Sequence, residues 1–172
     1  MRNEQMSATS VHPSTTAQPK RHPSLKETIM NIQQISVFLE NKPGRLANVA
    51  LVLRDSKINI RAMTIADTSD FGILRMIVNK PELANEVLKK AGFTVKLNTV
   101  VAVEIEDREG ILFDIMNLCD RIGLNVEYIY SFVEQYSNKA ILFLRFEDGD
   151  KAIDALVKNG YKLLSNEEVR KI

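Results

Sequence analysis

Hydrophobic positions from residue 32 onward follow first a period of two and then a helical period. Apolar residues occupy every second position at Ile35, Val37 and Leu39, which predicts a strand over Ile32–Glu40 with one buried face. After a turn over Asn41–Gly44, apolar residues recur at the i, i+3, i+4 and i+7 spacing of one helix face. The residues with this spacing are Leu46, Val49, Ala50 and Leu53. The pattern therefore predicts a strand, a turn and an amphipathic helix.

The rest of this first unit is predicted to contain two strands, a helix and a last strand. The two strands are expected over Ile58–Ala66 and Phe71–Val78, because turn-forming residues separate these apolar stretches. Pro81 favours the first turn of a helix, and Gly92 suits the C-cap of that helix. A fourth strand follows this glycine, so the order of elements is βαββαβ.

The same unit is then repeated. A shift of 66 residues places Asn41 on Asp107, Gly44 on Gly110 and Asn59 on Asn125; beyond a longer hairpin the shift is 68. The second unit is predicted to consist of strand Val100–Glu106, helix Ile111–Ile122, strands Leu124–Val133 and Ala140–Phe146, helix Lys151–Asn159 and strand Tyr161–Leu164. This order is typical of the α+β, ferredoxin-like arrangement, in which two helices cover one face of an antiparallel sheet.

The chain is predicted to have a disordered tail over residues 1–29 and two domains, over residues 30–97 and 98–172. The tail is rich in Ser, Thr, Gln, Pro and basic residues, and it cannot bury enough apolar surface to offset its ordering entropy. It lacks the apolar core of a secretory signal, and no apolar run in the chain is long enough to span a membrane. We therefore expect a cytoplasmic protein. Because no linker separates the two units, we also expect them to pack as one body.

The sheet face turned away from the helices is expected to be partly apolar. If Ile58 and Ile60 face the helices, then Phe38, Met63 and Ile65 lie on the far side. Exposed apolar faces usually find a partner. We therefore expect the sheets to pair between units or between chains, and the protein to form a homodimer.

Composition excludes several functions. The 23 Lys and Arg residues balance 22 Asp and Glu residues, which gives no basic surface for nucleic acid. Both histidines, His12 and His22, lie in the tail, so the folded part cannot use histidine for catalysis or metal binding. The single cysteine, Cys119, aligns with Leu53 and is expected to be a buried, inert thiol. We predict no cofactor and no metal, and a protein that is not an enzyme.

The turn before the first helix can bind a small molecule. The first N–H groups of a helix have no internal partner, and the helix dipole makes this end partly positive, so a carboxylate fits there. Gly44 leaves this end without a side chain, and Asn59 offers a carboxamide with two donors and an acceptor. Together these groups suit the carboxylate and the ammonium group of an amino acid.

Three stretches, Glu40–Ala47, Ile58–Ile60 and Asp70–Met76, together with the order of elements, resemble ACT domains. ACT domains are small-molecule regulatory modules of the ferredoxin-like class that are common in amino-acid metabolism. The resemblance extends from Ile32 to about Leu164 as two tandem copies. The first copy also resembles the regulatory subunit of acetolactate synthase. The resemblance implies a regulatory protein that binds a small L-amino acid at domain interfaces.

The family's contacts come from the turn after the first strand and from the start of the second strand. Carried over by position, the ligand-binding residues of the first copy are Asn41, Gly44, Arg45, Leu46, Asn59 and Ile60. Those of the second copy are Asp107, Gly110, Ile111, Leu112, Asn125 and Val126. The second copy has Glu109 where Pro43 stands, and its acidity would repel a carboxylate but could hold an ammonium group. The second site is therefore either degenerate or completes the first across an interface.

Structural roles alone would also explain these residues. Gly44 and Gly110 would then serve only their turns, and Asn59 and Asn125 would bond the local backbone. Arg45, on a first helical turn, would be solvated. The aromatic run Tyr128, Tyr130 and Phe132 is expected in a core or an interface.

The sequence fits three other functions of this fold less well than amino-acid binding. An acylphosphatase-like enzyme would use an arginine and an asparagine, as Arg45 and Asn59 superficially offer, but that family's phosphate-cradling sequence is absent. An RNA-binding module would need aromatic central strands and basic flanks, and the strand Phe71–Val78 is mostly aliphatic. A heavy-metal carrier would need a cysteine pair. A regulatory subunit that acts on a separate enzyme, with acetolactate synthase as the first candidate, remains the main alternative.

Overall fold

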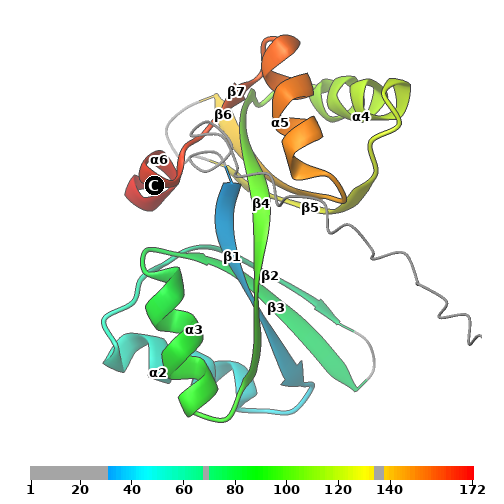
Figure 1. The fold of residues 1–172 in the computed structure, drawn as a ribbon. Coiled ribbons are helices and arrows are strands. Elements are labelled where there is room, and N and C mark those ends of the chain that lie inside the picture. Colours follow the sequence, from blue (N-terminus) through cyan, green and yellow to red (C-terminus); the bar gives the residue numbers. More distant parts are fainter. Residues whose placement is uncertain (1–30, 68–69, 134–137) are drawn as a thin grey trace, which may run out of the picture.

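The computed structural model describes residues 31–67, 70–133 and 138–172 (Figure 1). The first unit begins at strand β1, and its order of elements is the predicted one. Its elements are β1 (Asn31–Glu40), α2 (Arg45–Asp55), β2 (Ile60–Asp67), β3 (Phe71–Val78), α3 (Pro81–Lys90) and the first part of β4 (Thr94–Glu106). The predicted tail lies outside the described residues.

The second unit uses the end of β4 as its first strand. Its other elements are α4 (Ile111–Arg121), β5 (Val126–Val133), β6 (Lys139–Phe146), α5 (Gly149–Lys158), β7 (Lys162–Leu163) and α6 (Asn166–Lys171). The helix α6 was not predicted. The α+β class and the doubled βαββαβ order are confirmed.

Strand β4 belongs to both units and joins their sheets into one. The strands are arranged β2-β3-β1-β4-β6-β5, and β7 pairs with β4 beside this path. The first part of β4 pairs with β1, and the last part pairs with β6 from Val101 to Glu106. Figure 1 shows β4 running through both units, with α2 and α3 on one and α4 and α5 on the other. The predicted domain boundary after residue 97 thus falls inside a continuous strand.

Each unit packs its helices against one face of its part of the sheet. In the first unit, Ile35, Val37 and Leu39 pack with Val49 and Leu53 of α2 in one cluster. The second unit has an equivalent cluster. It includes Val101, Val103, Ile115, Cys119 and Leu156. The period-two and helical patterns of the sequence therefore correspond to real buried faces.

A third cluster joins the two units on the sheet faces away from the helices. Ile32 and Ile77 of the first unit pack there with Phe143 and Leu164 of the second, and the predicted aromatic run packs at its margin. Tyr130 stacks on Phe143 with 5.1 Å between ring centroids. The expected pairing of sheets between units is confirmed for this part of the far faces.

Polar contacts also tie the units together. Nε2 of the fully buried Gln34 donates to the hydroxyl of Tyr128 at 2.8 Å, and the hydroxyl of Tyr130 donates to Oε1 of Gln34 at 3.0 Å. Burial raises the pKa of Tyr130 well above its usual value. Arg61 on β2 donates to the backbone oxygen of Ile172 beyond α6 at 2.6 Å. The two units therefore form one body, as expected.

Two predictions about faces were wrong. Met63 pairs with Met76 and Ile65 with Leu74, so both lie on the helix side of β2 and not on the far side. A β-bulge between Ile60 and Ala62 changes the alternation, which explains the error. Phe38 does lie on the far face, opposite Ile73.

The prediction of the buried face of α2 was correct for only two of its four residues. Val49 and Leu53 are buried, but Leu46 and Ala50 are exposed on α2. In the second helix of this unit Ala84 and Leu88 are buried as the spacing indicates. The first unit thus leaves part of its apolar surface uncovered within one chain.

Among the residues that the structure describes, no helix is both long and apolar enough to cross a membrane. Nor does this part of the chain bring together three or more His, Cys, Asp or Glu side chains in a way that could hold a metal ion.

Candidate functional site

The first candidate junction is the turn from Glu40 to Gly44 and the start of α2. Asn41 N–H donates to the carbonyl of Asp70 at 2.9 Å, which fixes the turn against the start of β3. Gly44 is the N-cap of α2, with φ 85° and ψ −18°. This left-handed conformation favours glycine over any other residue. A Cβ at Gly44 would meet nothing within 4 Å, so backbone conformation rather than crowding accounts for the glycine.

The second junction has the same backbone and different charges. Gly110 is the N-cap of α4 with φ 81° and ψ −11°. Asp107 N–H donates to the carbonyl of Asn138 at 2.8 Å, as Asn41 does to Asp70. Arg108 pairs with Asp114 on the first turn of α4 at 2.8 Å. The positive end of α4 thus already has a carboxylate nearby, whereas α2 has no acidic residue in its first turn.

The two junction helices differ from the other capped helices in the same chain. The N-cap side chain of α5, Asp148, accepts from the backbone N–H of Lys151 at 3.0 Å. Ser165 and Glu168 form a capping box at the start of α6. No side chain caps α2 or α4 in this way. Their first N–H groups are therefore suitable for a carboxylate from a ligand. The helix α3 also has no side-chain cap, but it begins at Pro81, which has no N–H group to offer.

Arg45 and its neighbours occupy positions beside the first junction. The Arg45 guanidinium lies over the ring of Phe93, 5.1 Å from its centroid, and Nε is 3.7 Å from a carboxylate oxygen of Glu40. It is therefore half-buried and not simply solvated as expected. Leu46 is exposed beside it. In the second unit Ile111 is half-buried and Leu112 is exposed.

Asn59 and Asn125 lie at the other end of the helices. Asn59 is held by its backbone, since its N–H donates to Oδ1 of Asn79 at 3.0 Å and its carbonyl accepts from the N–H of Asn79 at 3.1 Å. Both asparagines are exposed, and within the described ranges their carboxamides bond no other residue. The alternative that these side chains serve only to bond the local backbone is therefore not supported.

Within a single unit, the junction and the asparagine are not close together. The helix α2 has 11 residues between Gly44 and the segment that leads to Asn59, and it is about 16 Å long. Ile60 and Val126, the other predicted residues at this end, are half-buried at the starts of β2 and β5. Groups from both ends can contact one small ligand only if they come from different units or different chains.

Each unit has a hollow at the same place, beside the turn after its first strand. The hollow of the first unit has a volume of about 320 Å³ and is lined by Glu40, Asn41, Lys42, Asp70 and Phe71. That of the second unit has about 470 Å³ and is lined by Glu106, Asp107, Arg108, Asn138 and Lys139, the equivalent residues. Of the predicted site residues, the hollows contain Asn41 and Asp107. They are a structural repeat that the sequence did not predict.

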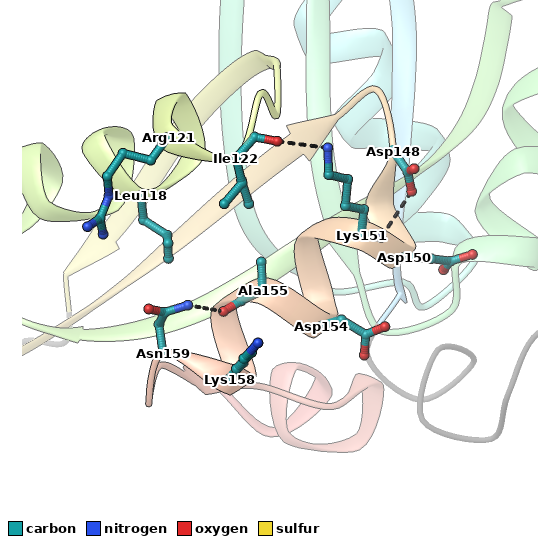
Figure 2. Close-up of a pocket in the computed structure, with 10 residues that line it drawn as sticks. All are labelled: Leu118, Arg121, Ile122, Asp148, Asp150, Lys151, Asp154, Ala155, Lys158 and Asn159. Carbon is teal, nitrogen blue, oxygen red and sulfur yellow. Dashed lines mark hydrogen bonds between the residues drawn. The ribbon is translucent and has the colours of Figure 1, made fainter.

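A wider cleft of about 910 Å³ runs between α4 and α5, as Figure 2 shows. Two of its polar side chains bond the backbone: Nζ of Lys151 donates to the carbonyl of Ile122 at 2.8 Å, and Nδ2 of Asn159 donates to the carbonyl of Ala155 at 2.8 Å. None of the predicted ligand-binding residues lines this cleft. The cleft therefore does not contribute to the candidate site.

Cys119 is buried in the core of the second unit, and burial raises the pKa of its thiol. A thiol with a raised pKa is a poor nucleophile at neutral pH. This confirms the prediction of a buried cysteine on the helix stripe.

Comparisons with known proteins agree with this architecture. The family model for an ACT domain pair matches residues 30–172. Protein BT0572 from Bacteroides thetaiotaomicron has a crystal structure that is similar over 84% of this chain and 99% of its own, with 36% identity and a TM-score of 0.79.

More distant structures share the fold. The regulatory subunit of aspartate kinase from Thermus thermophilus has 16% identity and a TM-score of 0.56, over 75% of this chain and 92% of its own. Its counterpart from Thermus flavus has 18% identity and the same TM-score and coverage. No match was found among curated protein sequences. From the doubled βαββαβ order and the family model that covers both units, the chain belongs to the ACT domain pair family.

Proposed function

We propose that this chain is a non-catalytic, cytoplasmic regulatory protein that binds a small L-amino acid. Its two ACT units, residues 30–97 and 98–172, would present one junction each. The observation that carries the proposal is the open start of α2: a left-handed Gly44 with no side-chain cap and no acidic residue in the first helical turn. Membership of the ACT domain pair family supports a regulatory role.

The first junction fits the carboxylate of an amino acid better than the second. The N–H groups at the start of α2 carry the partial positive charge of the helix. At the second junction Asp114 on the first turn of α4, together with the neighbouring Asp107 and Glu109, disfavours an added carboxylate. We therefore assign carboxylate binding to the first junction, with Asn41, Gly44, Arg45 and Leu46 around it.

The ammonium group of the ligand would be held by a carboxamide from another chain. Asn59 and Asn125 are exposed, and each lies at the far end of its own helix from the junction. A homodimer would bring the asparagine of one chain, with Ile60 or Val126 beside it, to the junction of the other. The exposed Met63 and Ile65 on the edge strand β2 support such contact between chains.

A thermal-shift screen of the twenty amino acids tests the proposal, because a ligand that binds only the folded state raises the melting temperature. We expect one or a few small L-amino acids to raise it, with Kd between ~1 mM and ~1 μM. Asn59→Ala should weaken this binding at least fivefold. Asn125→Ala is the matched control for the second unit. Isothermal calorimetry that stays flat for all twenty amino acids would contradict the proposal.

The dimer is tested separately by sedimentation velocity over a range of protein concentrations. If two chains build the site, dilution to monomer should abolish the response to the amino acid. A monomer that binds with undiminished affinity would contradict the shared site but not amino-acid binding itself.

A regulatory subunit of a separate enzyme is the second candidate. The observation that favours it is the start of α4, where Leu112 and Phe113 are exposed, Phe113 by 69%. The equivalent of Phe113 in the first unit is Ala47, so the aromatic ring is not required by the repeated fold. A large exposed aromatic side chain is typical of protein interfaces. Affinity capture from native extract should recover a stoichiometric enzyme, with acetolactate synthase as the first candidate. The Phe113→Ala variant should fail to recover this enzyme. Capture of only the chain itself would contradict this candidate.

A further inference from the structure

A row of polar side chains crosses the far face of the first unit, the face away from its helices. Thr64 on β2 pairs with Arg75 on β3, Arg75 pairs with Ser36 on β1, and Ser36 pairs with Lys96 on β4. Residues directly opposite each other on neighbouring strands project from the same face, with Cβ atoms about 5 Å apart. Two cations and two hydroxyl groups therefore lie side by side. We call Thr64, Arg75, Ser36 and Lys96 the polar row.

Arg75 has a cation that forms no ion pair with the described carboxylates. Its guanidinium carbon is 4.1 Å from the ring centroid of Tyr128, which comes from the second unit. Its Nε is shielded from solvent and has no hydrogen-bond partner. In the described part of the chain, no carboxylate or carbonyl pairs with this side chain. A buried donor without a partner lowers stability, so an unpartnered guanidinium calls for an explanation.

No residue that the structure describes accepts a hydrogen bond from the hydroxyl of Ser36. Its Oγ accepts from Nε2 of Gln34 at 3.1 Å and from Nδ2 of Asn98 at 3.1 Å. A serine hydroxyl has two acceptor positions and one proton, so only the proton is left for a further hydrogen bond. Ser36 is nearly fully buried, so its donor is fixed in place beside Arg75.

The equivalent positions of the second unit carry no such groups. They are occupied by Tyr130, Phe143, Ala102 and Leu164, which pack in the third cluster between the units. The same backbone therefore accommodates an apolar row at these positions. The fold does not explain why the first unit has two cations and two hydroxyls there.

Apolar side chains lie next to the polar row. Ala66, Ile73 and Phe38 form the neighbouring row of the same face, and Ala66 and Phe38 are exposed. A cavity of about 290 Å³ adjoins the β4 end of the polar row and is lined in part by Lys96 and Asn98. A ligand on this face would meet cations and hydroxyls at one end and an apolar surface at the other.

We propose that the polar row binds a small organic anion with an apolar substituent. Arg75 binds the carboxylate or phosphate group of this anion in its bidentate geometry, and Ser36, Thr64 and Lys96 donate the remaining hydrogen bonds. The substituent lies on Phe38 and Ile73. This site shares no residue with the amino-acid site, so it adds a second effector of a different chemical class.

Calorimetry at constant ionic strength tests the proposal with matched probes. 3-Phenylpropionate and phenyl phosphate carry an oxyanion and an aromatic ring, and 3-phenylpropan-1-ol has the same ring without a charge. We expect at least one of the two anions to bind the full chain, and the alcohol to bind at least tenfold more weakly. Which anion binds more tightly distinguishes a carboxylate from a phosphate ligand.

Variants locate the binding. Arg75→Gln should weaken the anion at least tenfold, while Arg54→Gln, which removes an exposed arginine from α2, should leave its affinity unchanged. Circular dichroism confirms that each variant is folded. Equal binding by Arg75→Gln and the wild type, or no binding of either anion at millimolar concentration, would overturn the proposal. Asn59→Ala should retain anion binding, so failure of the amino-acid site is distinguishable from failure of this one.

Discussion

The two units of this protein share a backbone and differ most on the sheet faces away from their helices. In the second unit this face is apolar and buried, with Phe143 1% exposed. In the first unit only part of the face is covered, and the equivalent of Phe143 is Arg75. The helix-facing clusters, by contrast, are alike in both units. The repeat thus preserves what holds each unit together and leaves the opposite face to acquire separate roles.

The largest expected effect separates these two faces. Phe143→Ala removes a buried ring that stacks on Tyr130, and we expect the free energy of unfolding to fall by about 3–5 kcal/mol. Arg75→Ala, at the equivalent position, should change it by less than about 1 kcal/mol, because the lost cation–π contact is offset by release of an unpartnered donor. Urea denaturation measures both. Similar losses for the two variants would mean that the two faces contribute equally to stability.

Periodicity in the sequence predicts most of the fold. The order of elements, the start of α3 at Pro81 and the burial of Cys119 all follow from local spacing and from the alignment of the two units. The prediction worked because each unit buries one continuous face, and a buried face leaves a regular pattern in the sequence. The two glycines at the junctions could be identified because their left-handed conformation excludes most other residues.

Other features depended on tertiary structure and could not be predicted. The bulge before Ala62 places Met63 and Ile65 on the face opposite to the predicted one, and no residue type in that stretch indicates a bulge. The helix α6 is held by its capping box and by Val169, which packs between the units. The site was predicted as one pocket, but a helix separates its two parts. Sequence alignment groups residues by their position within a unit, and it does not indicate distance across a helix.

The glycines test whether the two junctions are alike. Gly44→Ala and Gly110→Ala each force an L-residue into a left-handed conformation, which costs about 1–2 kcal/mol. Because a Cβ would meet no neighbouring atom at either position, we expect equal losses in free energy of unfolding. If only the first junction binds a carboxylate, only Gly44→Ala will also reduce the thermal response to the amino acid. Equal reduction by both variants would show that both junctions bind.

The N-caps of α3 and α5 provide a smaller contrast between equivalent positions. Asp148 caps α5, whereas its equivalent in the first unit, Lys80, makes no cap hydrogen bond through its side chain. Asp148→Ala should lower the free energy of unfolding by about 1 kcal/mol, and Lys80→Asp should raise it by about 0.5 kcal/mol. Thermal denaturation of both variants measures the shifts. A destabilising Lys80→Asp would mean that the contact of Lys80 with the carbonyl of Lys57 contributes more than a cap.

The smallest effect concerns Glu104, which takes the place of the exposed Phe38 in the second unit. Hydrogen bonds from Lys139 and Lys162, at 2.8 and 3.0 Å, lower the pKa of its carboxyl group. A lowered pKa contributes stability above the unfolded value, about 4.3, and this contribution is lost as the pH falls through the folded value. Since both lysines are exposed, Glu104→Gln should lower the free energy of unfolding at pH 7 by less than about 1 kcal/mol. Urea denaturation of both proteins at several pH values measures the difference, which should disappear below the folded pKa. A difference that persists at acidic pH would mean that Glu104 acts through packing, as its apolar counterpart would, and not through charge.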